Sequence, residues 1–365
     1  MLCDRINKLM QNGRTAVTDK ELEQAKREKL IREKPQVFEK IRKIEERHKL
    51  GIATPIIDIA YSYECNLRCR HCTASRFEKK ERKLTPGDLR RISDEAYALG
   101  LCQFCISGGE PLIFEDVDSV IFALQPDKFH LTMSTNGHFL TKEKAKHLKT
   151  LGLDKVKISL DDFDEAKHND NRRSDGAYRK AIDAMLNAKE AGLSVVIQTC
   201  VTRQNCQTEQ LKQMAKFATE NGFTVDVLIA RATGAWEGKH EVLITPEDAE
   251  FIRKAHEDYP VLHRDTFPSY GMDKGCGCVH STLHITPYGD VLPCVYIHIS
   301  IGNIFDESLA DIIKRGQSIK CFKSHNRLCL SGEDKGFIEK YMMKFYGKPL
   351  PFPWYEAFDK DDFVT

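Results

Sequence analysis

Short apolar runs alternate with helical segments through the middle of the chain, from residue 56 to about residue 235. The apolar runs have the length of strands. They predict strands at 56–62, 101–107, 129–134, 155–160, 194–201 and 223–230. The segments between them predict helices near 85–99, 141–150, 178–191 and 208–221, with N-caps at Thr85 and Thr141. Six β-α units in this order predict a parallel sheet, closed into a partial barrel over residues 55–235.

Charged residues crowd the segment from 13 to 50, where apolar residues such as Leu30 and Ile41 still recur at helical spacing. Proline suits the first turn of a helix, so the pattern predicts one or two surface helices, the second of which opens at Pro35. Charge runs usually face water. We therefore interpret residues 1–54 as a helical N-terminal extension that packs on the barrel, and the alternative is an arm that captures substrate.

A smaller unit is predicted after residue 235, where the pattern changes to a loop and a helix near 246–258. Two short apolar segments then flank a Pro-Tyr-Gly-Asp turn at 287–290, which predicts a hairpin whose open end brings Cys276 and Cys294 together. The remaining predictions are a helix near 308–315, an α+β domain over 236–335, and a C-terminal helix with an aromatic, proline-rich tail over 336–365.

The charge balance is nearly neutral, with 55 basic and 54 acidic residues, so nothing indicates a nucleic-acid partner. No apolar run approaches the roughly 18 to 20 residues that a membrane span needs. The 13 cysteines are odd in number, the chain is long, and its first residues lack a hydrophobic signal region. These features predict a cytoplasmic protein with reduced thiols.

Three cysteines follow the first predicted strand directly, as Cys65-x3-Cys69-x2-Cys72. Iron–sulfur clusters are held by cysteine thiolates, usually four, and a cubane with three protein ligands keeps one iron free for a small molecule. Zinc is the alternative, although structural zinc ligands usually come as C-x2-4-C pairs that a longer loop separates. The spacing therefore favours an iron–sulfur cluster with an open iron.

This motif at the end of a first strand resembles the signature of the radical S-adenosylmethionine (SAM) enzymes. The resemblance implies a partial (β/α)6 TIM-like barrel of the α/β class, with its chemistry at the carboxyl ends of the strands. It also implies a 4Fe-4S cluster on Cys65, Cys69 and Cys72, whose free iron binds the amino and carboxylate groups of SAM. In the family, the reduced cluster cleaves SAM to methionine and a 5'-deoxyadenosyl radical, which takes a hydrogen atom from substrate.

A glycine-rich turn ends the second predicted strand, in the order Ser107-Gly108-Gly109-Glu110-Pro111. Two glycines let a backbone approach a ligand closely, and a carboxylate can receive an ammonium group. The turn resembles the family motif that binds the amino group of SAM. Gly108, Gly109 and Glu110 are therefore predicted to bind SAM.

Polar residues also end the later strands. Asn136 follows the third strand, and Ser159 and Asp161 end the fourth, where they suit ribose hydroxyls or cap the next loop. The run from 157 to 161 resembles the fourth strand of the family, which implies SAM contacts for Ser159 and Asp161. Further candidates for cofactor binding are Gln198 and Arg231, at the ends of the fifth and sixth strands. Arg172 is interpreted as an exposed side chain, and the alternative is that its guanidinium forks onto a carboxylate.

The cysteine-rich region after residue 275 resembles the SPASM/twitch extension, in which a cysteine, a hairpin and later cysteines hold an auxiliary iron–sulfur cluster. The resemblance implies Cys276, Cys294, Cys321 and Cys329 as ligands of one auxiliary 4Fe-4S cluster. The cassette for a second auxiliary cluster is missing, and zinc is again the alternative. Cys278 is left over, either as an alternative ligand, as a packed thiol, or as a catalytic hydrogen-atom donor.

The predicted function is radical SAM chemistry that ends in net oxidation, by dehydrogenation or crosslinking, of a small molecule or peptide. A cluster with four protein ligands has no open iron and suits electron transfer, so the auxiliary cluster is expected to accept the electron. A flavodoxin or ferredoxin is the expected reducing partner. Three alternatives stay open: a redox-neutral epimerase with Cys278 as donor, radical rearrangement in cofactor biosynthesis, and a non-catalytic metal- or SAM-binding protein. Fold and cofactor do not fix the substrate.

Overall fold

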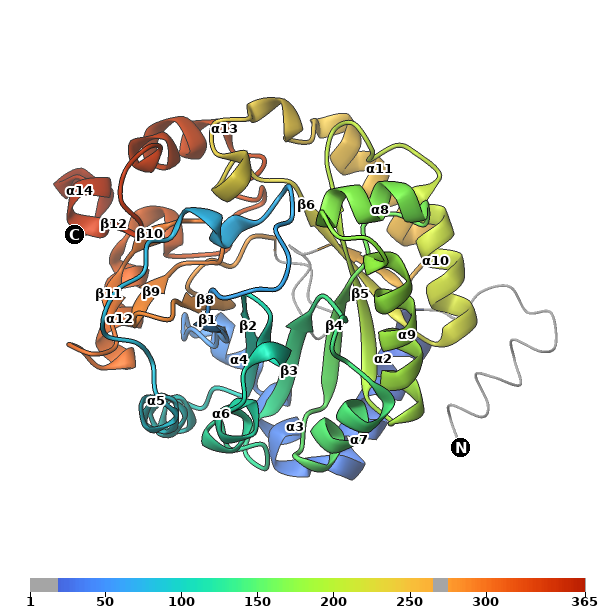
Figure 1. Cartoon of the computed structure of the whole chain (residues 1–365). Helices are drawn as coiled ribbons and strands as arrows, with labels where there is room; N and C mark the ends of the chain where they lie inside the picture. The colour runs from blue at the N-terminus through green and yellow to red at the C-terminus, as the bar shows by residue number, and fades with distance from the viewer. Residues whose placement is uncertain (1–18, 265–274, 365) are drawn as a thin grey trace.

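The computed structural model describes residues 19–264 and 275–364 and is built around one curved sheet (Figure 1). Its strand order is β11-β9-β8-β1-β2-β3-β4-β5-β6-β7, and β1 to β7 run parallel. The parallel strands are β1 (Ile56–Ser62), β2 (Gln103–Gly108), β3 (His130–Thr135), β4 (Lys155–Ser159), β5 (Ser194–Val201), β6 (Thr224–Ile229) and β7 (Leu262–Arg264). The predicted α/β barrel is confirmed, with one parallel strand more than the six predicted.

The additional strand, β7, follows a helix that the sequence analysis placed in the linker to the second unit. Helix α11 (Pro246–Asp258) packs on the sheet as the crossover between β6 and β7. The strand is only three residues long and ends at the edge of the described segment, so its apolar pattern is too short to recognise.

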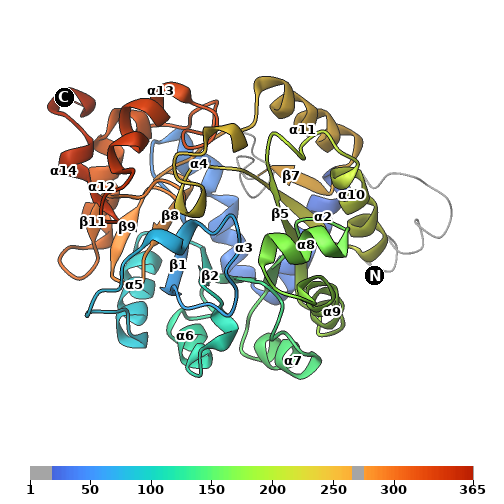
Figure 2. The same ribbon diagram turned by 45° about the horizontal axis from the view of Figure 1, so that its top comes forward.

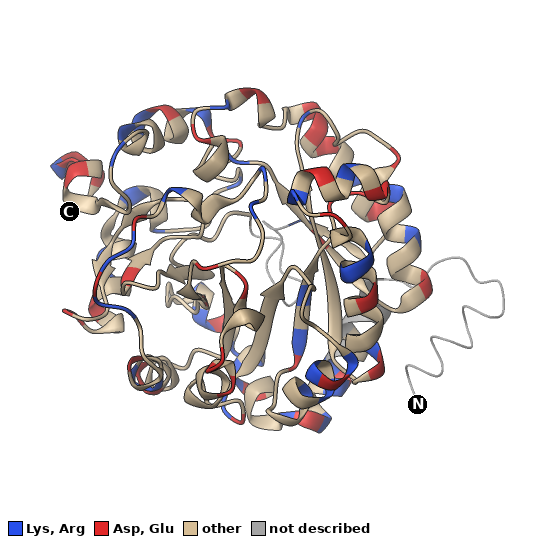
Figure 3. Cartoon of the chain, in the orientation of Figure 1, with Lys and Arg blue, Asp and Glu red and all other residues tan. Residues whose placement is uncertain are grey.

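Helices cover the outside of the sheet (Figure 1). They are α5 (Pro86–Ala98), α6 (Val117–Ala123), α7 (Lys142–Thr150), α9 (Ala177–Glu190) and α10 (Gln210–Asn221), with α8 (Glu165–Arg172) after β4. Thr85 begins α5 through a capping box with Asp88, as its sequence predicts. The sequence analysis missed α6 and α8 because both are short and α8 is almost wholly polar. Figure 3 shows both signs of charge interspersed over the outer helices.

The predicted C-terminal hairpin joins the barrel sheet instead of forming a separate one. Strands β8 (Thr282–Ile285) and β9 (Asp290–Leu292) make the hairpin, and β8 pairs in parallel with β1, with Ile57 opposite Leu283. β11 (Gly302–Asn303) continues that edge, and α12 (Leu309–Ser318) packs against α5. The second cysteine region is therefore fixed to the strand that leads to the first one.

The C-terminal segment covers the hairpin side of the molecule (Figures 1 and 2). β10 (Ile299–Ser300) pairs with β12 (Phe352–Pro353), which ties this segment to the auxiliary region. The predicted helix over 337–346 is helical but irregular: α13 (Lys335–Phe337) leads into a π-helical turn over Ile338–Met342 and a 3-10 turn over Met343–Phe345. A short helix, α14 (Trp354–Ala357), follows β12.

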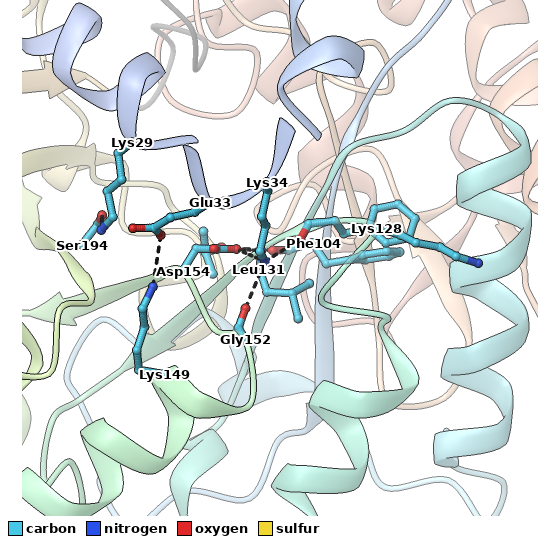
Figure 4. Close-up of polar contacts among 12 residues, drawn as sticks. Lys29, Glu33, Lys34, Phe104, Lys128, Leu131, Lys149, Gly152, Asp154 and Ser194 are labelled. Atoms are coloured by element: carbon cyan, nitrogen blue, oxygen red, sulfur yellow. Dashed lines mark hydrogen bonds and ion pairs between the residues drawn. The ribbon is translucent and has the colours of Figure 1, made fainter. Parts of the chain in front are cut away.

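The N-terminal extension packs beneath the barrel as α2 (Asp19–Glu33), α3 (Pro35–Arg42) and α4 (Ile44–Lys49), seen behind the strands in Figure 2. The predicted helix start at Pro35 is confirmed. Residues 1–18 lie outside the described part of the chain. Lys34 reaches under the sheet, where its Nζ lies 2.6 Å from Asp154 and 3.0 Å from the Gly152 carbonyl (Figure 4). Because these groups precede β4, the extension covers the amino ends of the strands and leaves the carboxyl ends open.

Candidate active site

The first three cysteines lie in the loop that leaves the carboxyl end of β1. The backbone N–H of Leu67 donates to the Cys65 sulfur at 3.4 Å, and the N–H of Cys72 donates to the Cys69 carbonyl at 3.3 Å. All three side chains are half-buried. Burial raises the pKa of Cys65 to about 11 and also raises the pKa of Cys72, because a thiolate is poorly solvated there. A positive metal centre would reverse this penalty, since a coordinating thiol is deprotonated.

The two glycines after β2 are required by the chain itself. A Cβ on Gly109 would lie 1.9 Å from the Glu64 carbonyl oxygen, and one on Gly108 would lie 2.3 Å from that of Ser62. The same backbones are joined by hydrogen bonds, from Gly109 N–H to the Ser62 carbonyl at 2.8 Å and from Glu110 N–H to the Glu64 carbonyl at 2.9 Å. The sequence analysis assigned this close approach to a ligand. In the structure it clamps the segment that leads into Cys65.

Glu110 is fully buried. Its carboxylate accepts hydrogen bonds from Thr135 Oγ1 at 2.7 Å, from the Asn136 N–H at 2.7 Å and from the Leu112 N–H at 3.1 Å. Burial raises its pKa, and these hydrogen bonds offset part of that shift. Three donors of the protein therefore fix the carboxylate, and its contact with the amino group of SAM stays a prediction.

Asn136 continues this network to the cysteine loop. Its Nδ2 donates to Asn66 Oδ1 at 2.8 Å and lies 4.0 Å from the Cys65 sulfur. Its Oδ1 accepts the N–H of His138 at 2.9 Å, which fixes the side chain. The structure thus places Asn136 against the first cysteine loop, and its contact with the cofactor stays a prediction.

Asp161 and Arg172 form a buried ion pair beside Cys69. Arg172 Nη2 lies 2.8 Å from Asp161 Oδ1, and Nη1 lies 3.8 Å from the Cys69 sulfur. Burial opposes ionisation, but Arg172, His71 and His168 together hold the pKa of Asp161 below its ordinary value. The interpretation of Arg172 as an exposed side chain is wrong, because the residue is only 8% exposed. Burial at a loop that closes over another element has no signal in the local sequence.

Ser159, the last residue of β4, lies opposite Gln198, which is within β5. Both side chains are half-buried, and Asp161 follows Ser159 by two residues. His71, which the sequence analysis did not select, lies in the cysteine loop with its ring 5.7 Å from that of Trp236. Burial lowers the pKa of His71 to about 4, so its imidazole is neutral near pH 7. Its position between two cysteines was the available signal.

The second cysteine group is brought together by the hairpin. The sulfurs of Cys276 and Cys278 lie 3.5 Å apart. Hydrogen bonds with Cys278 and Cys329 lower the pKa of Cys276 well below its ordinary value, whereas those with Cys276 and Cys294 raise the pKa of Cys278 well above it. These contacts link Cys294, Cys278, Cys276 and Cys329 in one largely buried group.

Cys321 and Arg231 are placed differently from their predictions. The charges that act on the Cys321 thiol are those of Asp362, Lys340 and Asp334, on the C-terminal segment. Arg231, expected at the SAM site, instead donates from Nη2 to the Cys329 sulfur at 3.3 Å. Arg231, the second residue after β6, therefore contacts the second cysteine group.

The residues at the first site fit a cluster with SAM. The three cysteines follow β1 and Asp161 follows β4, so all lie beyond the carboxyl ends of strands, and Asp161 Oδ2 is buried and accepts no hydrogen bond from the described residues. An orphaned buried acceptor of this kind suits a ligand hydroxyl or amine. Within 19–264 and 275–364, no three His, Cys, Asp or Glu side chains converge as a single metal ion would need. In that same part of the chain, no helix combines the length and apolar character that crossing a bilayer demands.

The fold and site define an α/β-barrel protein with two cysteine centres, and comparison with known proteins gives the family. Residues 59–226 match the radical SAM superfamily, and residues 276–331 match SPASM, an iron–sulfur cluster-binding domain. The chain belongs to the radical SAM superfamily and carries a C-terminal SPASM domain. Its cofactors are accordingly 4Fe-4S clusters and SAM.

Relatives and solved structures agree with this assignment. The chain is 28% identical over 279 residues to the mycofactocin maturase MftC of Mycolicibacterium smegmatis. The match covers 72% of this chain and 70% of MftC. It is 23% identical to the AdoMet-dependent heme synthase of Nitratidesulfovibrio vulgaris, over 71% of this chain and 78% of the relative. The fold resembles Streptococcus suis SuiB bound to precursor peptide SuiA, with a TM-score of 0.58 and 19% identity, and the match covers 76% of this chain and 69% of SuiB.

The fold also resembles anSMEcpe with bound AdoMet, with a TM-score of 0.56 and 21% identity. That match covers 71% of this chain and 80% of anSMEcpe.

Proposed function

We propose that this enzyme oxidises a peptide substrate, by dehydrogenation or crosslinking, and that an auxiliary 4Fe-4S cluster takes up the electron. The observation that carries the proposal is that pairwise contacts link Cys276, Cys278, Cys294 and Cys329 in one largely buried group. Four thiolates fill the protein-ligand positions of a cubane, which then has no open iron and suits electron transfer.

The ligand set in this proposal differs from the predicted one in a single residue. Cys278, 1% exposed and joined to Cys276 and Cys294, takes the place that the sequence analysis gave to Cys321. The same placement argues against a redox-neutral epimerase with Cys278 as hydrogen donor, because a ligating sulfur has no hydrogen to give. Cys321 is proposed to pack against the C-terminal segment.

The residues of the first site are proposed to hold the first cluster and to orient SAM. When bound and reduced, the first cluster supplies the cleavage of SAM that yields a 5'-deoxyadenosyl radical. Cys65, Cys69 and Cys72 would hold it, while Asn136 and Arg172 fix the loop by contacts with Cys65 and Cys69. Asp161, anionic and with one orphaned oxygen, is proposed to accept a hydrogen bond from SAM, and Ser159 and Gln198 to line the same strand end.

A peptide is the proposed substrate class because SuiB and anSMEcpe have been solved with peptides bound. In the proposed reaction the substrate would lose a hydrogen atom, an electron and a proton, and Cys276, Cys278, Cys294 and Cys329 would hold the cluster that takes the electron. A flavodoxin or ferredoxin is proposed to reduce the first cluster.

The proposal is tested first by iron content. In full-length protein with Cys65, Cys69 and Cys72 replaced by alanine, we expect about four irons and a reducible paramagnetic signal. Adding Cys278→Ala should remove most of this iron, whereas Cys321→Ala, the matched control, should leave it. The reverse pattern would return Cys321 to the ligand set.

The reaction is tested with the otherwise intact enzyme, SAM, dithionite and a library of short synthetic peptides. We expect one 5'-deoxyadenosine and a loss of two hydrogens for each product. A product of unchanged mass that carries solvent deuterium would replace oxidation with epimerisation.

A further inference from the structure

Arg231 lies against a sulfur of the second cysteine group, and its position is fixed from several sides. It follows β6, is 5% exposed, and donates from Nη2 to the Cys329 sulfur at 3.3 Å. Its Nη1 donates to the Ile229 carbonyl, and its guanidinium carbon lies 4.0 Å from the centre of the Tyr296 ring. The cation is thus held in a buried place where it faces Cys329.

Cys329 is held just as firmly. Its backbone N–H donates to Glu333 Oε2 at 2.9 Å, and Glu333 is ion-paired with Arg264. The glycine at 332 lets this turn pack on β6, because a Cβ there would lie 2.9 Å from Ile229 Cδ1. The distance between the guanidinium and the sulfur is therefore a property of the packed fold.

A buried positive charge on a cluster ligand has a definite physical effect. Each electron that enters a cluster adds negative charge, and a nearby cation with a hydrogen bond to a ligating sulfur stabilises that reduced form. Hydrogen bonds to the sulfurs are among the factors that set the reduction potentials of iron–sulfur clusters. A guanidinium is suited to this task because it stays charged when it is buried.

The first cysteine site offers a comparison. There Arg172 is ion-paired with Asp161 at 2.8 Å, and its Nη1 lies 3.8 Å from the Cys69 sulfur. The contact of Arg231 with the Cys329 sulfur is shorter, at 3.3 Å. Of the two arginines, Arg231 therefore makes the closer contact with a cysteine sulfur.

We propose that Arg231 is a tuning residue, which raises the reduction potential of the auxiliary cluster and thereby favours electron transfer from the substrate radical to that cluster. This inference rests on the proposed function for the presence of the cluster. One electron leaves the substrate radical and one enters the auxiliary cluster, so no further oxidant is required for the step. The residue that the sequence analysis assigned to SAM is thereby given a role at the other centre.

The test is a redox titration followed by paramagnetic resonance. The protein is the full chain with Cys65, Cys69 and Cys72 replaced by alanine, so that only the auxiliary cluster contributes. Arg231→Met should lower the midpoint potential, Arg231→Lys should lower it less, and Arg253→Met on the exposed face of α11 should leave it unchanged. Arg231→Met with full iron content and an unchanged potential would overturn the proposal.

A second measurement covers the case in which Arg231→Met fails to load iron. Arg231→Lys keeps a positive charge at this place and Arg231→Gln removes it, so both are titrated beside the parent after iron loading. Arg231→Gln should lower the midpoint potential more than Arg231→Lys, and equal potentials in all three proteins would overturn the proposal. If the parent protein itself holds no iron, the proposed function fails, whereas a potential shift without substrate oxidation leaves the role of Arg231 in place.

Discussion

Glu110 accepts a hydrogen bond from the backbone N–H of Asn136 at 2.7 Å, and this bond joins the turn after β2 to the end of β3. Asn136 in turn contacts Asn66 and the Cys65 sulfur. A carboxylate that resembles a ligand-binding group therefore fixes the geometry of the first cysteine loop.

We expect Glu110→Gln to destabilise the apoprotein by about 1–3 kcal/mol, because an amide donor would face N–H groups that need an acceptor. Chemical denaturation measures this loss, and exposed Glu115→Gln is the control. If Glu110→Gln left the stability of the apoprotein unchanged and the cluster-loaded variant bound SAM weakly, the results would support the predicted contact with the ammonium group.

Gly109→Ala should damage the first centre selectively. A Cβ at this position would lie 1.9 Å from the Glu64 carbonyl, so the segment leading to Cys65 must move. We expect loss of the SAM-binding cluster with the auxiliary cluster kept, which an iron count and SAM cleavage would show. Gly87→Ala is the control, because its Cβ would meet its nearest neighbour at an ordinary 3.5 Å. Full iron and normal cleavage in Gly109→Ala would contradict the clamp.

Lys34→Met should cost about 3–5 kcal/mol of unfolding free energy, because it leaves the Asp154 carboxylate buried and without its cation. The side chains of Lys34 and Asp154 are 11% and 9% exposed. Lys149→Met breaks the more exposed ion pair with Glu33 and should cost under about 1 kcal/mol. Thermal or urea unfolding measures the loss of stability in the two apoprotein variants. Equal losses in Lys34→Met and Lys149→Met would show that the buried ion pair contributes no more than the exposed one.

His298 should make the fold sensitive to acid. It is fully buried, and burial lowers its pKa to about 3, below the ordinary value near 6.5. Between these values the unfolded chain binds a proton that the folded chain excludes, so stability is complete above about pH 6.5 and falls as the pH approaches 3.

We therefore expect His298→Phe to reduce the loss of apoprotein stability between pH 7 and pH 4, as measured by urea unfolding at each pH. The ring of His298 already lies between those of Phe77 and Phe345, at 4.8 and 5.6 Å. Exposed His240→Phe should leave the pH dependence as it is. If the unfolding free energy of His298→Phe depended on pH as that of the parent does, the acid sensitivity would be assigned to other groups.

The sequence by itself determined the parts of this protein that depend on local pattern. Alternating apolar runs predicted β1 to β6, Thr85 and Pro35 predicted helix starts, and the spacing of Cys65, Cys69 and Cys72 predicted a cluster. These features depend on residues a few positions apart, so the pattern carries them.

Only the tertiary structure decided which side chains meet. The sequence predicted Cys321 as a partner of Cys276 and left Cys278 over, whereas in the structure the Cys278 sulfur lies 3.5 Å from that of Cys276. Arg231 and Glu110 both end strands, yet one turns to Cys329 and the other into a buried network. The direction of a side chain beyond a strand end depends on loops from distant parts of the chain, and that information is absent from any local pattern.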